Sequence, residues 1–190
     1  MSGKNAWSPV DRSRPDVSLR DLIAGGDRRS VRQSEQARAL VNARPERVSE
    51  IAVLADDDDW LVSMRALDLL EKLAHEHADW VEPYKKLFIG PLADSDKWEV
   101  RLQVVRALPL LAWTPRERKR VIEILHRDVE HSQRFVAAWA LDGLAKLAEA
   151  DRTLLSLVTP YLDSFERSGS KALATRAKHI RARLLARGIA

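Results

Sequence analysis

The chain of 190 residues contains no cysteine, and this absence excludes several classes of protein. Without thiols there is no disulfide framework, no thiolate metal site and no cysteine nucleophile. The composition fits a reducing compartment, so we expect a cytoplasmic protein. The first 20 residues hold no apolar run of the kind a signal peptide needs, and no later stretch is long enough to span a membrane. We therefore expect neither a signal peptide nor a membrane partner.

Sequence signals for catalysis and for metal binding are also missing. There is no Gly-x-Ser-x-Gly, no glycine-rich phosphate loop and no HExxH. His75 and His77 are two residues apart, so on a helix they do not face each other as joint ligands. The run from Asp56 to Asp59 lacks the spread ligands and central glycine of an EF-hand, and helix capping explains it. We predict no catalytic residue, no cofactor and no metal, and hence a protein that is not an enzyme.

Alternating strand patterns are absent, and apolar residues recur instead with a spacing near 3.6 along most of the chain. Start signals are clear at Thr114-Pro115-Arg116-Glu117, and Asp79 with Glu82 resembles a capping box. Residues 1–16 are expected to form a disordered tail, and residues 17–190 a single helical domain. The expected helices are 17–24, 30–43, 45–54, 60–75, 79–90, 94–113, 115 onward, 132 onward, 151 onward and 170–187.

Four segments of the sequence repeat one pattern. Each starts with an apolar residue, has a small or β-branched residue four positions later, and has a leucine eleven positions after its start. The residues at the small position are spaced by 38, 36 and 37, which leaves room for two helices and two turns per period. Small residues there let neighbouring helices approach closely. They are Ala66, Val104, Ala140 and Ala177, and the leucines are Leu73, Leu111, Leu147 and Leu184.

The repeated pattern resembles HEAT repeats of the bacterial kind. Those carry an acid in a turn, a valine four residues later, often an arginine beside it, and then alanine and leucine. The stretch from Asp96 to Arg101 matches, and the stretch from Asp58 to Val62 matches except that Ser63 replaces the arginine. The resemblance implies an all-α fold, a right-handed α-solenoid of about four to five HEAT-like helix pairs. It also implies that the second helix of each pair lines the concave face.

Taking the helices that start near Pro45, Asp79, Pro115 and Asp151 as the second helices, we predict a basic strip on the concave face. The charge distribution supports it, because the chain from Pro115 onward holds 15 Lys/Arg against 9 Asp/Glu. Solvated basic helices would give the same distribution. The candidate residues for binding a partner are Trp80, Tyr84, Lys85, Lys86, Arg116, Lys119, Arg120, Arg127 and Arg152.

Binding is the class of function that remains, and the leading hypothesis is a scaffold that binds another protein through the concave face. The alternative is nucleic-acid binding by the basic strip. A HEAT-like class of DNA glycosylases also combines tryptophans with basic residues, although no catalytic acid can be placed here. A phycobilisome-type chromophore lyase shares only the repeat. The six tryptophans are mostly expected to be structural, with Trp139 in the core and Trp80 as the best exposed candidate.

Overall fold

The computed structural model describes residues 17–30 and 32–189, so the predicted tail of residues 1–16 lies outside the described residues. All regular elements in this part of the chain are helical, with η marking 3₁₀-helices, and none of its helices is long and apolar enough to cross a membrane. The elements are α1 (Leu19–Ile23), α2 (Ser34–Ala43), η1 (Pro45–Arg47), α3 (Val48–Leu54), α4 (Trp60–Glu76), α5 (Ala78–Val81), η2 (Glu82–Ile89), η3 (Pro91–Asp94), α6 (Trp98–Ala107), η4 (Leu108–Leu110), α7 (Pro115–Val129), α8 (Arg134–Ala150), η5 (Arg152–Leu154), α9 (Leu155–Arg167) and α10 (Lys171–Ala186).

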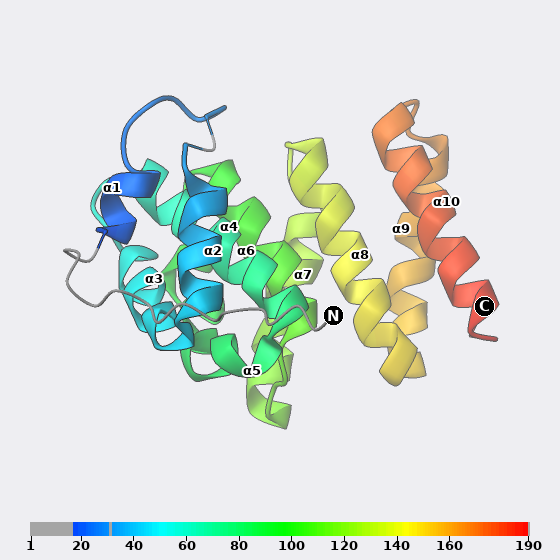
Figure 1. Ribbon diagram of the computed structural model, residues 1–190. Coiled ribbons are helices and arrows are strands. Elements are labelled where there is room, and N and C mark those ends of the chain that lie inside the picture. Colours follow the sequence, from blue (N-terminus) through cyan, green and yellow to red (C-terminus); the bar gives the residue numbers. More distant parts are fainter. Residues whose placement is uncertain (1–16, 31, 190) are drawn as a thin grey trace, which may run out of the picture.

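The helices form two rows that run along the molecule in chain order, from α1 and α2 at one end to α9 and α10 at the other (Figure 1). One row holds α2, α4, α6, α8 and α10, and from α4 onward each helix packs closely against the next. The other row holds α1, α3, η2, α7 and α9, which touch one another much less. In a curved array the closely spaced row lies on the inside of the curve. We call the first the inner row and the second the outer row.

The helix pairs are offset by one helix from the predicted pairs. Helix α7 packs along α8 far more extensively than against α6, α3 packs along α4, and α9 packs on both neighbours but more on α10 than on α8. Each pair therefore consists of an outer helix followed by an inner helix, such as α7 with α8. The prediction that the helices starting near Pro45, Asp79, Pro115 and Asp151 are second in their pairs is wrong, and their predicted place on the concave face stays a prediction. A repeat period alone does not show where the unit begins.

The small-residue positions of the repeat all lie in the core. Ala66, Val104, Ala140 and Ala177 are fully buried, one on each of the inner helices α4 to α10. Apolar side chains from both rows form one contiguous cluster around them. The helices approach closely at Gly143 on α8, where a Cβ atom would lie 2.9 Å from a methyl group of Leu125 on α7. Small residues therefore set the distance between neighbouring helices, as the repeat pattern predicts.

Helix boundaries follow the local signals in some places and not in others. Thr114 and Glu117 form the predicted capping box at the start of α7. Asp79 is not a cap, because α5 already begins at Ala78. Helix α6 ends at Ala107 rather than near Trp113, since Pro109 cannot donate the next helical hydrogen bond.

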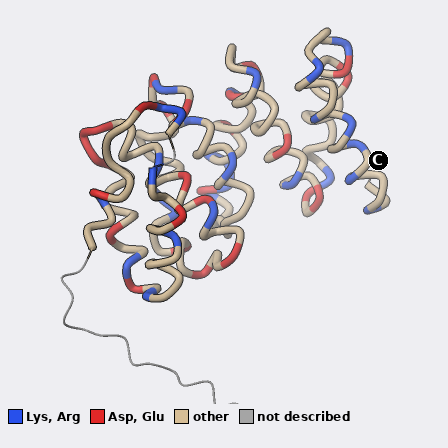
Figure 2. The backbone as a smooth tube through the Cα atoms, turned by 45° about the horizontal axis from the view of Figure 1, so that its top comes forward, with Lys and Arg blue, Asp and Glu red and all other residues tan. Residues whose placement is uncertain are grey.

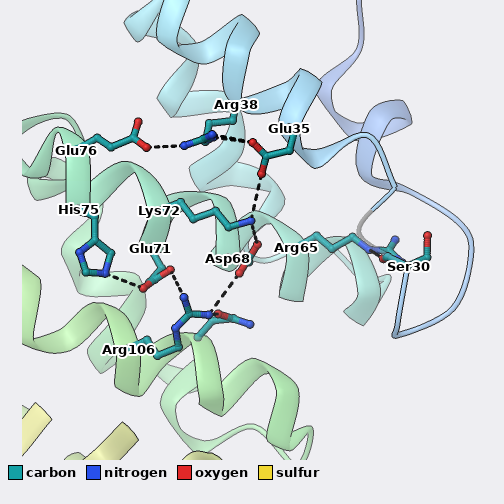
Figure 3. A network of polar contacts seen from close by, with 11 residues as sticks. Ser30, Glu35, Arg38, Arg65, Asp68, Glu71, Lys72, His75, Glu76 and Arg106 are labelled. Atoms are coloured by element: carbon teal, nitrogen blue, oxygen red, sulfur yellow. Dashed lines mark hydrogen bonds and ion pairs between the residues drawn. The ribbon is translucent and has the colours of Figure 1, made fainter. Parts of the chain in front are cut away.

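A buried arginine of α4 helps to hold the N-terminal end of the array. The guanidinium of Arg65 on α4 donates hydrogen bonds to the carbonyl oxygens of Ile23, Gly25, Asp27 and Ser30, at 2.5 to 3.0 Å. The side chain reaches the loop after α1 and contacts Ser30 there (Figure 3). Burial lowers the pKa of Arg65, but a guanidinium remains charged at neutral pH. Arg65 therefore fixes α1 and the following loop to α4.

Candidate interaction surfaces

The predicted basic strip lies on the outer row. Trp80 is on α5 and Tyr84, Lys85 and Lys86 are on η2, while Arg152 opens η5. The remaining four residues, Arg116, Lys119, Arg120 and Arg127, are on α7. The structure brings several of them near one another, but on the side of the array where the helices are widely spaced.

Acidic residues neutralise much of this strip. The ammonium of Lys85 donates to Glu82 at 2.6 Å and to the carbonyl of Ala112 at 2.5 Å, and the hydrogen bond to Glu82 raises the pKa of Lys85. Arg120 and Arg127 both bind Asp94, which belongs to the preceding pair. The hydrogen bond from Arg127, reinforced by the charge of Arg120, lowers the pKa of Asp94.

Three cations of the strip remain available. Lys86, Arg116 and Lys119 are exposed and form no ion pair with any residue that the structure describes. Arg152 reaches only the carbonyl of Gly188, at 3.4 Å. Basic and acidic segments are interspersed over most of the molecule (Figure 2). The strip is therefore a set of separate positive charges, not a continuous basic groove.

The two aromatic candidates are each partly covered. The Trp80 ring stacks on His77 with 3.9 Å between ring centroids, and the residue is half-buried. Tyr84 is also half-buried and packs against the core. Trp80, the tryptophan expected to be exposed, is therefore only partly so.

The inner row carries a chain of charge pairs that links one helix to the next. Arg38 on α2 binds Glu35 at 2.7 Å and Glu76 on α4 at 2.5 Å. Lys72 on α4 lies between Glu35 and Asp68, at 3.5 Å and 2.9 Å (Figure 3). These pairs join α2 to α4.

Arg106 continues the chain of charge pairs from α4 to α6. It binds Glu71 at 2.8 Å and lies 3.6 Å from Asp68, and Glu71 also contacts His75 at 3.0 Å (Figure 3). Glu71 is only 1% exposed, so these partners satisfy a buried carboxylate. The inner face is thus highly charged but internally compensated on its N-terminal side.

Trp139 on α8 lies at the middle of the inner row, between an arginine of α6 and an arginine of α10. The guanidinium of Arg106 on α6 lies 5.4 Å from its ring centroid, and that of Arg176 on α10 lies 3.9 Å from it. The tryptophan is half-buried rather than in the core as predicted, because α6 and α10 flank α8 and supply arginines instead of apolar cover. Arg176 has one carboxylate in reach, Asp142 at 3.9 Å. Sequence reasoning missed this site because its three members come from three repeats.

A hollow of about 530 Å³ separates α3 from η2 and η3 on the outer row. We call it the α3–η2 groove. Val53 at its rim is 74% exposed, and the groove also contains the two predicted residues Tyr84 and Lys86. A smaller hollow of about 300 Å³ lies beside Trp113, Lys119 and Ile122. Both occur on the row whose helices are widely spaced.

Comparison with known proteins identifies the architecture only. No family model and no curated protein matches the chain. Among solved structures, an engineered protein superposes with a TM-score of 0.60 at 18% identity, over 85% of this chain and 77% of its own. A designed armadillo repeat protein in complex with the peptide (KR)4 gives 0.56 at 17%, over 86% and 71%. The fold is a helical-repeat solenoid.

A computationally designed armadillo repeat protein for modular peptide recognition also matches, with a TM-score of 0.55 at 17% identity, over 90% of this chain and 79% of that one. At such identities the likeness shows the fold alone. Within the described ranges 17–30 and 32–189, no group of three His, Asp or Glu side chains is arranged to hold a metal ion.

Proposed function

We propose that this chain is a non-catalytic, HEAT-like repeat scaffold that binds a segment of another protein along its inner row. The observation that carries the proposal is Trp139, which lies on the middle of that row with arginines on both sides. Tryptophan and arginine are the residues most enriched among those that dominate binding energies at protein interfaces. Solenoids present their inner surface as an extended binding site.

The charges of the inner row favour a polypeptide over a uniformly charged polymer. Acids and bases alternate there within paired sets, such as Asp68 with Lys72 and Asp142 with Arg176. An extended peptide can contact such a surface with residues of either sign and with its main-chain amides, whereas a phosphate backbone would find cations that are already paired with carboxylates. The structures of designed armadillo repeat proteins, one of them in complex with a peptide, are consistent with this use of the fold.

The test is to select peptides from a phage-displayed library of random linear sequences against the full chain and to measure their affinities by fluorescence anisotropy. We expect Trp139→Ala to weaken the selected peptides at least about tenfold, a loss of about 1.4 kcal/mol. Trp80→Ala is the matched control, because it removes a half-buried tryptophan from α5, outside the inner row. Arg176→Gln tests the same site at a partly exposed position, without placing a second carboxylate beside Asp142.

Circular dichroism and melting temperature establish that each variant is folded before affinities are compared. If the selected peptides bind the Trp139 and Arg176 variants as tightly as the unchanged protein, the inner row is not the binding surface. If no peptide is selected at all, the proposal of a peptide-binding scaffold fails.

Nucleic-acid binding is the second candidate, and the exposed cations Lys86, Arg116 and Lys119 favour it. Three phosphate contacts would lower the affinity for duplex DNA about 40-fold between about 50 and 200 mM salt. Anisotropy titrations with labelled single- and double-stranded DNA and RNA test this, with Arg116→Ala/Lys119→Ala beside the unchanged protein. Binding that persists at the higher salt and is lost in this variant would replace the protein-binding proposal.

A further inference from the structure

We infer that the α3–η2 groove is a second docking site, independent of the inner row, for an amphipathic helix of a partner protein. Its volume of about 530 Å³ falls within the range of ligand sites in proteins. Its walls are mainly apolar, with one charged residue on each side. The groove is lined by Val53 on α3, Asp56 just after α3, Tyr84, Lys86 and Leu87 on η2, and Leu92 on η3.

The groove is open because the outer row is irregular at this point. Helix α3 ends at Leu54 after seven residues, and its neighbour is a 3₁₀ segment followed by Gly90 and Pro91. These elements make few contacts with one another, so no side chain from η2 covers Val53. A large aliphatic side chain that is 74% exposed beside other apolar side chains marks a surface suited to a partner.

The two rims of the groove carry opposite charges. Asp56 stands at the end of α3, and Lys86 stands on η2 across the groove. Both are exposed, and neither forms an ion pair among the residues that the structure describes. A bound segment is therefore complementary when it carries a basic residue towards Asp56 and an acidic residue towards Lys86. The two charges therefore set the direction in which the segment binds as well as the charged residues it carries.

A helix fits this site better than an extended strand. The described chain has no β-strand and hence no sheet edge to which a peptide strand could be added. The groove separates two helical elements of one layer, and the side chains of a third helix pack into such a space as ridges into grooves. The apolar residues of the bound helix would recur every three or four positions, with the two charged residues on its flanks.

The test uses a phage-displayed library of amphipathic helical peptides in which the apolar stripe is fixed and the flanking positions are randomised. Peptides enriched on the full chain are measured by fluorescence anisotropy against Val53→Glu and against the matched control Phe135→Glu. Phe135 is also an exposed large apolar residue, at 60%, but it begins α8 far along the chain from the groove. We expect Val53→Glu to weaken binding at least about tenfold and Phe135→Glu to leave it unchanged, because a carboxylate in an apolar groove is poorly solvated.

A second selection on Lys86→Glu tests the charge complementarity. The residue opposite position 86 should change from acidic to basic among the enriched peptides. The inference is overturned if no helical peptide is enriched, or if the enriched peptides bind the Val53 variant normally. It is also overturned if analytical ultracentrifugation shows a dimer that Val53→Glu dissociates, since a second copy would then occupy the groove. Loss of binding in Trp139→Ala but not in Val53→Glu would support the proposed function and refute only the groove.

Discussion

Replacing Arg65 by methionine should release α1 and its following loop from the array. The substitution removes hydrogen bonds to the carbonyl oxygens of Ile23, Gly25, Asp27 and Ser30. At about 1 kcal/mol net for each bond, the upper limit is about 4 kcal/mol. Gly25 and Asp27 are exposed residues whose carbonyls water can reach, so we expect a loss of roughly 2 to 3 kcal/mol in the free energy of unfolding.

The assay combines urea denaturation, followed by circular dichroism, with hydrogen exchange measured by mass spectrometry. Local opening should appear as faster exchange in α1 and in residues 24–33, while α8 and α10 keep their protection. Arg65→Lys should recover only part of the loss, because an ammonium has three donors on one nitrogen. Arg28→Met is the control, since Arg28 is exposed and pairs with Glu99 at 3.4 Å. A change below about 1 kcal/mol with unaltered exchange in α1 would refute this account of Arg65.

Two further substitutions test the packing and the charge pairs. Gly143→Ala should destabilise the protein by about 1 to 2 kcal/mol in urea unfolding, because its Cβ would press on fully buried Leu125; a gain in stability would contradict this. Asp94 has a pKa lowered by Arg127 and Arg120, so its contribution to stability is present above its unfolded pKa of about 3.9 and is lost as the pH falls further. The melting temperature of Asp94→Asn should therefore fall less than that of the unchanged protein between about pH 5 and pH 2, and equal falls would count against this pair.

Local signals were sufficient to predict the helical repeat. The capping box at Thr114 and Glu117 lies within four residues, and the small positions such as Ala66 and Ala140 recur at the repeat spacing. Each signal depends only on neighbouring residues or on a simple period, so it does not depend on how the rest of the chain folds. Together they predicted most helices and the solenoid.

The predicted pairing of the helices was wrong because it depended on which helix begins each pair. That choice follows from packing between helices, such as α7 on α8, which the period does not encode. The positive charge of the basic strip was also overestimated, because Asp94 from the preceding pair of helices binds Arg120 and Arg127. Ion pairs between residues about thirty positions apart cannot be read from local charge.

The α3–η2 groove could be anticipated only in part. Pro83 and the Gly90-Pro91 pair signal an interrupted helix, since proline lacks the amide that a regular helix uses. They do not show that the neighbouring helix α3 would end early enough to leave Val53 uncovered. The same limit applies to Trp139, whose two arginines come from the repeats on either side.

The most direct test of the protein-binding proposal is to map a selected linear peptide on the full chain by ¹H–¹⁵N correlation NMR. The account predicts that chemical shifts change for residues of α6, α8 and α10, including the indole N–H of Trp139, while α7 changes little. Shifts confined to η2 and α7, around Lys86 and Lys119, would contradict it and would place binding on the outer row instead.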